Sequence, residues 1–141
     1  MKKTFKKNEI ADIAKEIVQT LVLEDHATII ALHGDLGAGK TTLSQALAKE
    51  LGITENVISP TFIIMKNYET KKGAHKKLVH IDAYRLNSES ELEKLGWEEI
   101  VADKNNLVLI EWPERVPNLI PKHAKKISLS HENEEERTIE F

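Results

Sequence analysis

The chain has 141 residues, of which 40% are apolar and 30% charged, the ordinary balance of one soluble globular domain. Its net charge of −3 excludes a global basic field for nucleic acid, and the absence of cysteine excludes disulfides and thiolate metal sites. No apolar run approaches the roughly 20 residues of a membrane helix. The opening "MKKTFKK" resembles the start of a signal peptide, but Glu9, Asp12 and Glu16 interrupt the next apolar stretch, so we expect a cytoplasmic protein.

The first half of the chain predicts two helices around a buried strand. Residues 9–22 carry apolar side chains at helical spacing, with charges on the opposite face. The run "ATIIALH" at 27–33 is apolar and rich in β-branched residues, which is typical of a buried parallel strand. Residues 41–52 predict the second helix, with Gly52 as its stop.

The second half predicts several strands and one further helix. The helix is expected at 88–101, where Ser88 and Glu91 form a capping-box pattern and Gly96 is a candidate break. A basic turn at 71–77 joins the first two strands of this half. Helices mixed with parallel-type strands predict a single three-layer α/β domain over residues 1–141. The expected strands cover residues 62–70, 78–84, 106–112, 125–131 and 137–141.

A phosphate-binding pattern, G-x-x-x-x-G-K-[ST], is matched at every fixed position by "GDLGAGKT" at 34–41. The glycines let the backbone turn tightly and aim its N–H groups at phosphates. Lys40 supplies a cation to the outer phosphates, Thr41 offers a hydroxyl to Mg²⁺, and the following helix adds its positive end. A strand before the loop and a helix after it favour this site over a glycine-rich structural turn. The predicted nucleotide-binding residues here are Gly34, Asp35, Leu36, Gly37, Ala38, Gly39, Lys40, Thr41 and Thr42.

Two carboxylates are candidates for the metal side of this site. Asp82 follows the apolar run "LVHI", and Glu111 follows "LVLI". Open α/β sheets place their ligands at the carboxyl ends of strands, and a phosphate site of this kind needs an acidic residue there for Mg²⁺. The spacing does not decide which of the two is the metal ligand and which positions an attacking water. The alternative is that both are surface carboxylates at strand ends.

Two further features lie near these carboxylates in the sequence. The stretch "SPTF" at 59–62 places Thr61 where nucleotide switches order a loop, although four such residues alone favour a plain turn. His80 lies two residues before Asp82, so both side chains point to the same face of the strand. With no third ligand nearby in sequence, we interpret His80 as a hydrogen-bonded structural residue.

Taken together, "GDLGAGKTTL", "SPTF", "HIDAYR" and "EWPE", in this order, resemble the TsaE family of tRNA threonylcarbamoyladenosine biosynthesis. The resemblance covers nearly the whole chain. It implies a P-loop NTPase fold with a mostly parallel central sheet and antiparallel edge strands. It also implies binding of ATP or ADP with Mg²⁺ and slow hydrolysis of ATP by the protein alone.

The resemblance further implies partners and residue roles. The family acts with TsaD and TsaB, does not perform the threonylcarbamoyl transfer itself, and meets tRNA indirectly. Lys40, Asp82 and Glu111 would be catalytic. Thr41, Asp82 and Glu111 would serve the metal, with Glu111 the favoured ligand. Thr61 would lie in the switch-like loop, Trp112 matches a family tryptophan, and the N- and C-terminal segments would supply the adenine pocket.

A kinase, a GTPase and a nucleotide-sensing module are the alternatives to this function. A small-molecule kinase would need an arginine-rich lid, but after Trp112 the sequence holds only Arg115 and Arg137. A GTPase would need the string N-K-x-D, which does not occur. A nucleotide-sensing module without significant catalysis is not excluded. Direct tRNA contact also stays open, with a solvated loop the favoured interpretation of the basic segment Lys66, Lys71, Lys72, His75, Lys76 and Lys77.

Overall fold

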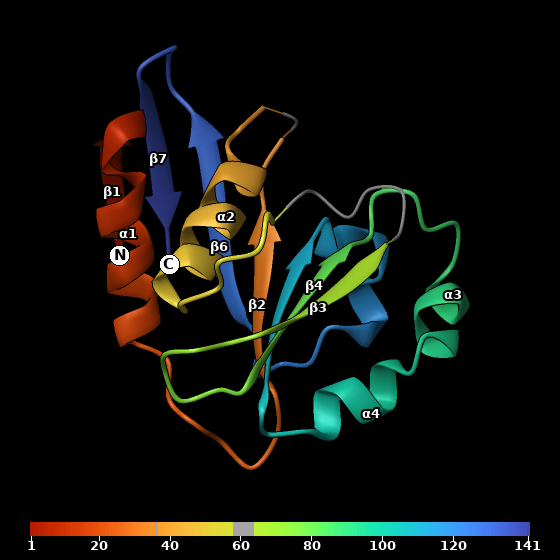
Figure 1. The fold of residues 1–141 in the computed structure, drawn as a ribbon. Coiled ribbons are helices and arrows are strands. Elements are labelled where there is room, and N and C mark those ends of the chain that lie inside the picture. The colour runs from red at the N-terminus through yellow and green to blue at the C-terminus, as the bar shows by residue number, and fades with distance from the viewer. Residues whose placement is uncertain (36, 58–63) are drawn as a thin grey trace.

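In the computed structural model, which describes residues 1–35, 37–57 and 64–141, one mixed sheet carries helices on both faces (Figure 1). The order of its seven described strands is β1-β7-β6-β2-β5-β4-β3. The four neighbouring strands from β6 to β4 run parallel to one another, and the pairings outside them are antiparallel. This confirms a parallel centre with antiparallel edges. The bounds are β1 Lys2–Lys6, β2 Thr28–His33, β3 Met65–Glu69, β4 Lys77–Asp82, β5 Asn106–Glu111, β6 Lys125–His131 and β7 Glu136–Glu140.

Two helices cover each face of the sheet, which gives the predicted three layers. Helices α1 (Ile10–Gln19) and α2 (Lys40–Glu50) share one core with Ile30 and Leu32 of β2. Helices α3 (Glu89–Lys94) and α4 (Trp97–Ala102) share the other core with Ile29 and Ala31 of the same strand. This alternation is why Thr28 to Leu32 are all buried, because each face of a central strand packs against a helix layer. Short 3₁₀ turns lie at Lys7–Glu9 (η1), Pro113–Arg115 (η2) and Pro117–Leu119 (η3).

The first strand was not predicted. The segment "KKTFK" forms β1 and pairs antiparallel with β7, from Lys2 opposite Glu140 to Lys6 opposite Glu136. Phe5 is its only buried residue, so the strand lacks the apolar alternation that would have indicated it. An edge strand of the sheet is therefore formed by the basic residues that resemble the start of a signal peptide. No helix within the described ranges is long and apolar enough to cross a membrane.

The helix expected at 88–101 is two helices, because Gly96 adopts φ 90° between α3 and α4. The predicted capping box is wrong: the Ser88 side chain makes no cap hydrogen bond, and its Oγ lies 2.9 Å from Ser90 Oγ instead. The helix expected to reach residue 22 ends at Gln19, where Thr20 Oγ1 donates to the Ile17 carbonyl at 2.7 Å.

The basic turn before β4 contains one residue that does not belong to its surface. His75 is buried, with Nε2 2.8 Å from Thr28 Oγ1, and burial lowers the pKa of its imidazole. The lysines of the same turn are exposed, and the backbone N–H groups of Lys71 and Lys72 both donate to the Leu51 carbonyl at the end of α2. His75 is therefore a structural residue and leaves the basic segment considered for tRNA contact.

Candidate functional site

Two glycines allow the loop between β2 and α2 to adopt its conformation. A Cβ at Gly34 would lie 2.9 Å from the backbone carbonyl oxygen of Leu129 in β6, so the loop approaches that strand more closely than a side chain permits. Gly39 adopts φ 103° at the residue before α2, a conformation that L side chains rarely adopt. Helix α2 therefore begins at Lys40 with its N-terminal end toward the loop, as the phosphate-binding prediction requires.

Lys40 is only 6% exposed, and its ammonium group contacts two of the described residues. Nζ donates to the Gly34 carbonyl within the same loop and lies 3.4 Å from the centroid of the Trp112 ring. Burial lowers the pKa of Lys40, and nearby carboxylates oppose this, Glu111 most strongly. The loop thus holds a largely buried cation, and this positive charge would attract an anion.

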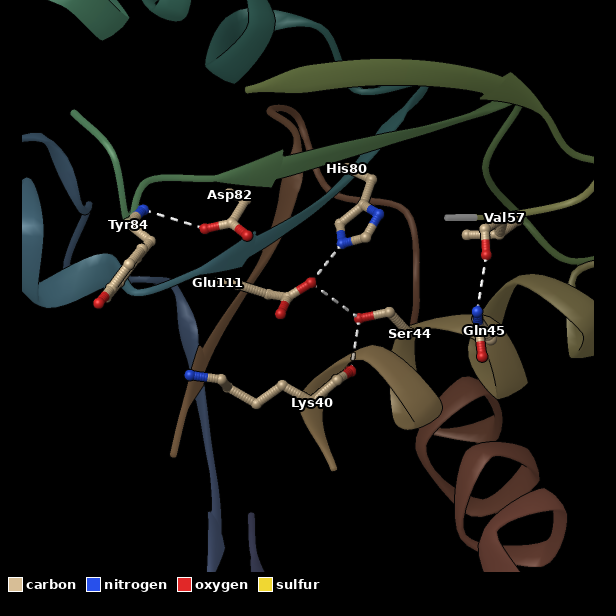
Figure 2. Close-up of polar contacts among 8 residues, drawn as sticks. All are labelled: Lys40, Ser44, Gln45, Val57, His80, Asp82, Tyr84 and Glu111. Atoms are coloured by element: carbon tan, nitrogen blue, oxygen red, sulfur yellow. Dashed lines mark hydrogen bonds and ion pairs between the residues drawn. The ribbon is translucent and has the colours of Figure 1, made fainter. Parts of the chain in front are cut away.

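The two predicted carboxylates meet at the ends of neighbouring strands. Asp82 of β4 and Glu111 of β5 are paired residues in the parallel register, and their exposed fractions are 4% and 2%. Asp82 Oδ1 accepts a hydrogen bond from the Tyr84 backbone N–H at 2.9 Å, and Glu111 Oε2 lies 2.6 Å from His80 Nε2. Figure 2 shows both carboxylates on the side of the sheet that faces Lys40 and the start of α2.

A cavity of about 480 Å³ joins the loop to these carboxylates, within the range of small-molecule sites. Its walls include residues that lie far from the loop in sequence. Phe5, Lys7 and Ile10 come from the N-terminal segment, and Leu129 and Arg137 come from the C-terminal strands. Both chain ends reach this cavity because β1, β7 and β6 are neighbours in the sheet (Figure 1). The predicted residues that line it are Gly37, Ala38, Gly39, Lys40, Thr41, Thr42, Asp82 and Glu111.

The groups gathered here suit a nucleotide phosphate with a hard divalent cation. Thr41, Asp82 and Glu111 offer only oxygen ligands, which Mg²⁺ prefers, and usually few of them come from the protein. No group of three or more His, Asp or Glu side chains placed to hold a metal occurs among the described residues. The donor set therefore fits a cation whose remaining ligands come from phosphate and water. Leu36 and Thr61 were also predicted to bind nucleotide, and both lie outside the described residues, as does the whole segment 59–62.

Several contacts of the site were missed from the sequence. The His80–Glu111 contact is diagonal across two strands, since His80 is paired with Leu109, and it becomes visible only once the register is known. Ser44 Oγ donates to the Lys40 carbonyl at 2.8 Å and lies 3.4 Å from the same Glu111 oxygen. In the sequence, Arg137 stands out only as one of two arginines after Trp112. No periodicity or motif connects it to the loop.

Comparison with known proteins gives one consistent family. The family model for "Threonylcarbamoyl adenosine biosynthesis protein TsaE" matches residues 4–139. A TsaE protein of Rickettsia felis is 37% identical over 130 residues, which are 92% of this chain and 71% of the relative. A TsaE protein of Synechocystis is 44% identical over 108 residues, 74% of this chain and 64% of the relative. The crystal structure of Bacillus subtilis YdiB is similar with a TM-score of 0.72 at 30% identity, covering 99% of this chain and 84% of that one.

Proposed function

Because this chain belongs to the TsaE family of threonylcarbamoyl adenosine biosynthesis proteins, we propose that it is a magnesium-dependent ATPase that supports this modification of tRNA. The observation that carries the proposal is that residues 37–42 of the phosphate-loop segment and two buried strand-end carboxylates line one cavity. We assign the P-loop NTPase fold on the same ground, since the loop joins a central parallel strand to a helix.

The roles of the polar residues are inferred from their places. Lys40 would contact the outer phosphates, with Thr41 at the start of the same helix and Glu111 opposite it as the favoured metal ligands. When bound, Mg²⁺ would neutralise charge that develops on the phosphates. Asp82, paired with Glu111 and held by the Tyr84 N–H, would serve the metal or orient the attacking water.

The base and ribose of ATP would occupy the far end of the cavity. Phe5, Ile10 and Leu129 give that end an apolar wall, and Lys7 and Arg137 add cations. Arg137 is 8% exposed, and its Nη1 donates to the backbone carbonyls of Asn133 and Glu136, which fixes the direction of the guanidinium group. This arrangement supports an adenine pocket formed by the two chain ends.

The output of hydrolysis would be a conformational change in an assembly with TsaD and TsaB in the cytoplasm. Arg137 is the only arginine among the described residues that line the cavity, so no arginine-rich lid lies over it there. This argues against a kinase that closes over a second substrate. Contact with tRNA would be indirect, through the assembly. The protein would reset this assembly between turnovers and would not transfer the threonylcarbamoyl group itself.

Single-turnover hydrolysis of ATP, measured with and without TsaD and TsaB, tests the ATPase proposal. We expect slow hydrolysis by the protein alone, a higher rate with the partners, and loss of both in Glu111→Ala. If the partners never raise the rate and Glu111→Ala still supports modification of tRNA, the protein is a nucleotide-sensing module and not a working ATPase.

A further inference from the structure

Glu111 is in contact with a buried histidine of the neighbouring strand. His80 is fully buried in β4, and its Nε2 lies 2.6 Å from Glu111 Oε2. Glu111 lies two residues beyond Leu109, the residue paired with His80, so both side chains share the α2 side of the sheet. A buried carboxylate so close to a ring N–H is fixed in direction, because turning away would leave both groups without their partner.

The two oxygens of Glu111 have different surroundings. Oε2 meets His80 and, at 3.4 Å, the hydroxyl of Ser44, which is itself tied to the Lys40 carbonyl in the first turn of α2. Oε1 has no hydrogen-bond partner among the described residues, and Glu111 lines the cavity. Figure 2 shows His80 and Ser44 on one side of the carboxylate and Lys40 below it.

We propose that His80 is a positioning residue that holds Oε2 of Glu111, so that Oε1 is presented to the metal and phosphate side of the cavity. This inference rests on the proposed function. A ligand carboxylate is commonly oriented by such an outer partner, and loss of that partner typically weakens metal affinity about 10- to 100-fold. Ser44 Oγ contacts both Glu111 Oε2 and the Lys40 carbonyl, so it connects the carboxylate to the first turn of α2.

Three substitutions separate this role from simple packing. His80→Met introduces an apolar side chain of similar length and removes the donor. His80→Gln places an amide N–H near the reach of Nε2, whereas the shorter amide of His80→Asn does not reach it. His75→Met is the matched control, because His75 is also buried and hydrogen-bonded, to Thr28 instead of Glu111.

The measurement is the binding of a fluorescent ADP analogue, titrated at increasing Mg²⁺, with urea unfolding of each variant beside it. We expect His80→Met and His80→Asn to require about 10-fold or more Mg²⁺ for the same binding. His80→Gln should recover most of the loss, and His75→Met should show the same Mg²⁺ dependence of binding as the unaltered protein. If His80→Met does not fold, the comparison of Gln with Asn carries the same test.

Two results would overturn the inference. One is a Mg²⁺ titration of His80→Met that matches that of the unaltered protein, and the other is a His80→Gln variant no better than His80→Asn. Either leaves the proposed function standing if the unaltered protein still binds nucleotide with Mg²⁺. If the unaltered protein shows no Mg²⁺ dependence at all, the proposed function itself fails.

Discussion

Replacing Lys40 by Met should separate nucleotide binding from stability. The substitution removes two contacts of the ammonium group, the hydrogen bond to the Gly34 carbonyl and the contact with the Trp112 ring. These contacts are worth about 1.5–3 and about 1–2 kcal/mol by comparison with similar pairs. It also removes the free-energy cost of keeping a charge on a residue that is 6% exposed. The lowered pKa of Lys40 indicates that this cost of burial exceeds the favourable effect of the nearby carboxylates.

Because these contributions have opposite signs, we expect them largely to cancel and the free energy of unfolding to change by less than about 1 kcal/mol. Nucleotide affinity behaves differently, because nothing replaces a charge-assisted contact to phosphate. Its loss costs about 1.5–3 kcal/mol, which corresponds to about 10- to 100-fold in Kd.

The assay pairs urea unfolding with titration of a fluorescent ADP analogue on Lys40→Met and the unaltered protein. We expect nearly coincident unfolding curves and a clearly weaker Kd. A variant that binds nucleotide as tightly as the unaltered protein would refute the role given to the loop. A loss of several kcal/mol in stability would show that Lys40 is mainly a structural residue.

The other predictions concern the loop, the C-terminal wall and the buried histidine. Gly34→Ala should cost about 1–3 kcal/mol of stability in urea unfolding and abolish nucleotide binding, because its Cβ meets the Leu129 carbonyl. Gly96→Ala, with φ 90° and open space around it, should cost about 1–2 kcal/mol and leave binding intact; equal binding by both variants would contradict the close approach. Arg137→Met should weaken ADP binding about 10-fold without altering its Mg²⁺ dependence, and an unchanged Kd would remove Arg137 from the site. The pKa of His75 is lowered from its ordinary value of 6.5, so the unfolded chain takes up a proton that the folded protein does not, and stability falls as the pH drops below 6.5 toward the lowered pKa. His75→Met should flatten this part of the stability–pH curve. An unchanged slope would contradict the structural role given to His75.

The central part of the fold could be predicted from the sequence because that part is buried on both faces. The runs at Thr28–His33 and Asn106–Glu111 are apolar throughout most of their length, and each forms a central parallel strand as expected. β1 could not be predicted in this way. An edge strand with a single buried residue, Phe5, is stabilised by pairing with β7, whose paired residues lie 130 to 138 positions further along the chain.

Parts of the candidate site could likewise be predicted from local sequence, and other parts could not. The loop and the two carboxylates were predicted because a short motif and the ends of apolar strands can be recognised locally. His80 was correctly expected to be hydrogen-bonded, but its partner depends on the register of β4 against β5. The wall formed by Phe5 and Arg137 depends on the order of the edge strands, which no local pattern encodes.

The central claim is that the nucleotide state of this cavity controls an assembly with TsaD and TsaB. The most direct test is association of the purified protein with a TsaD–TsaB pair, measured with ATP, with ADP and without nucleotide, each in the presence of Mg²⁺. We expect association that depends on ATP and weakens in Lys40→Met. Absence of association under every nucleotide condition would contradict it.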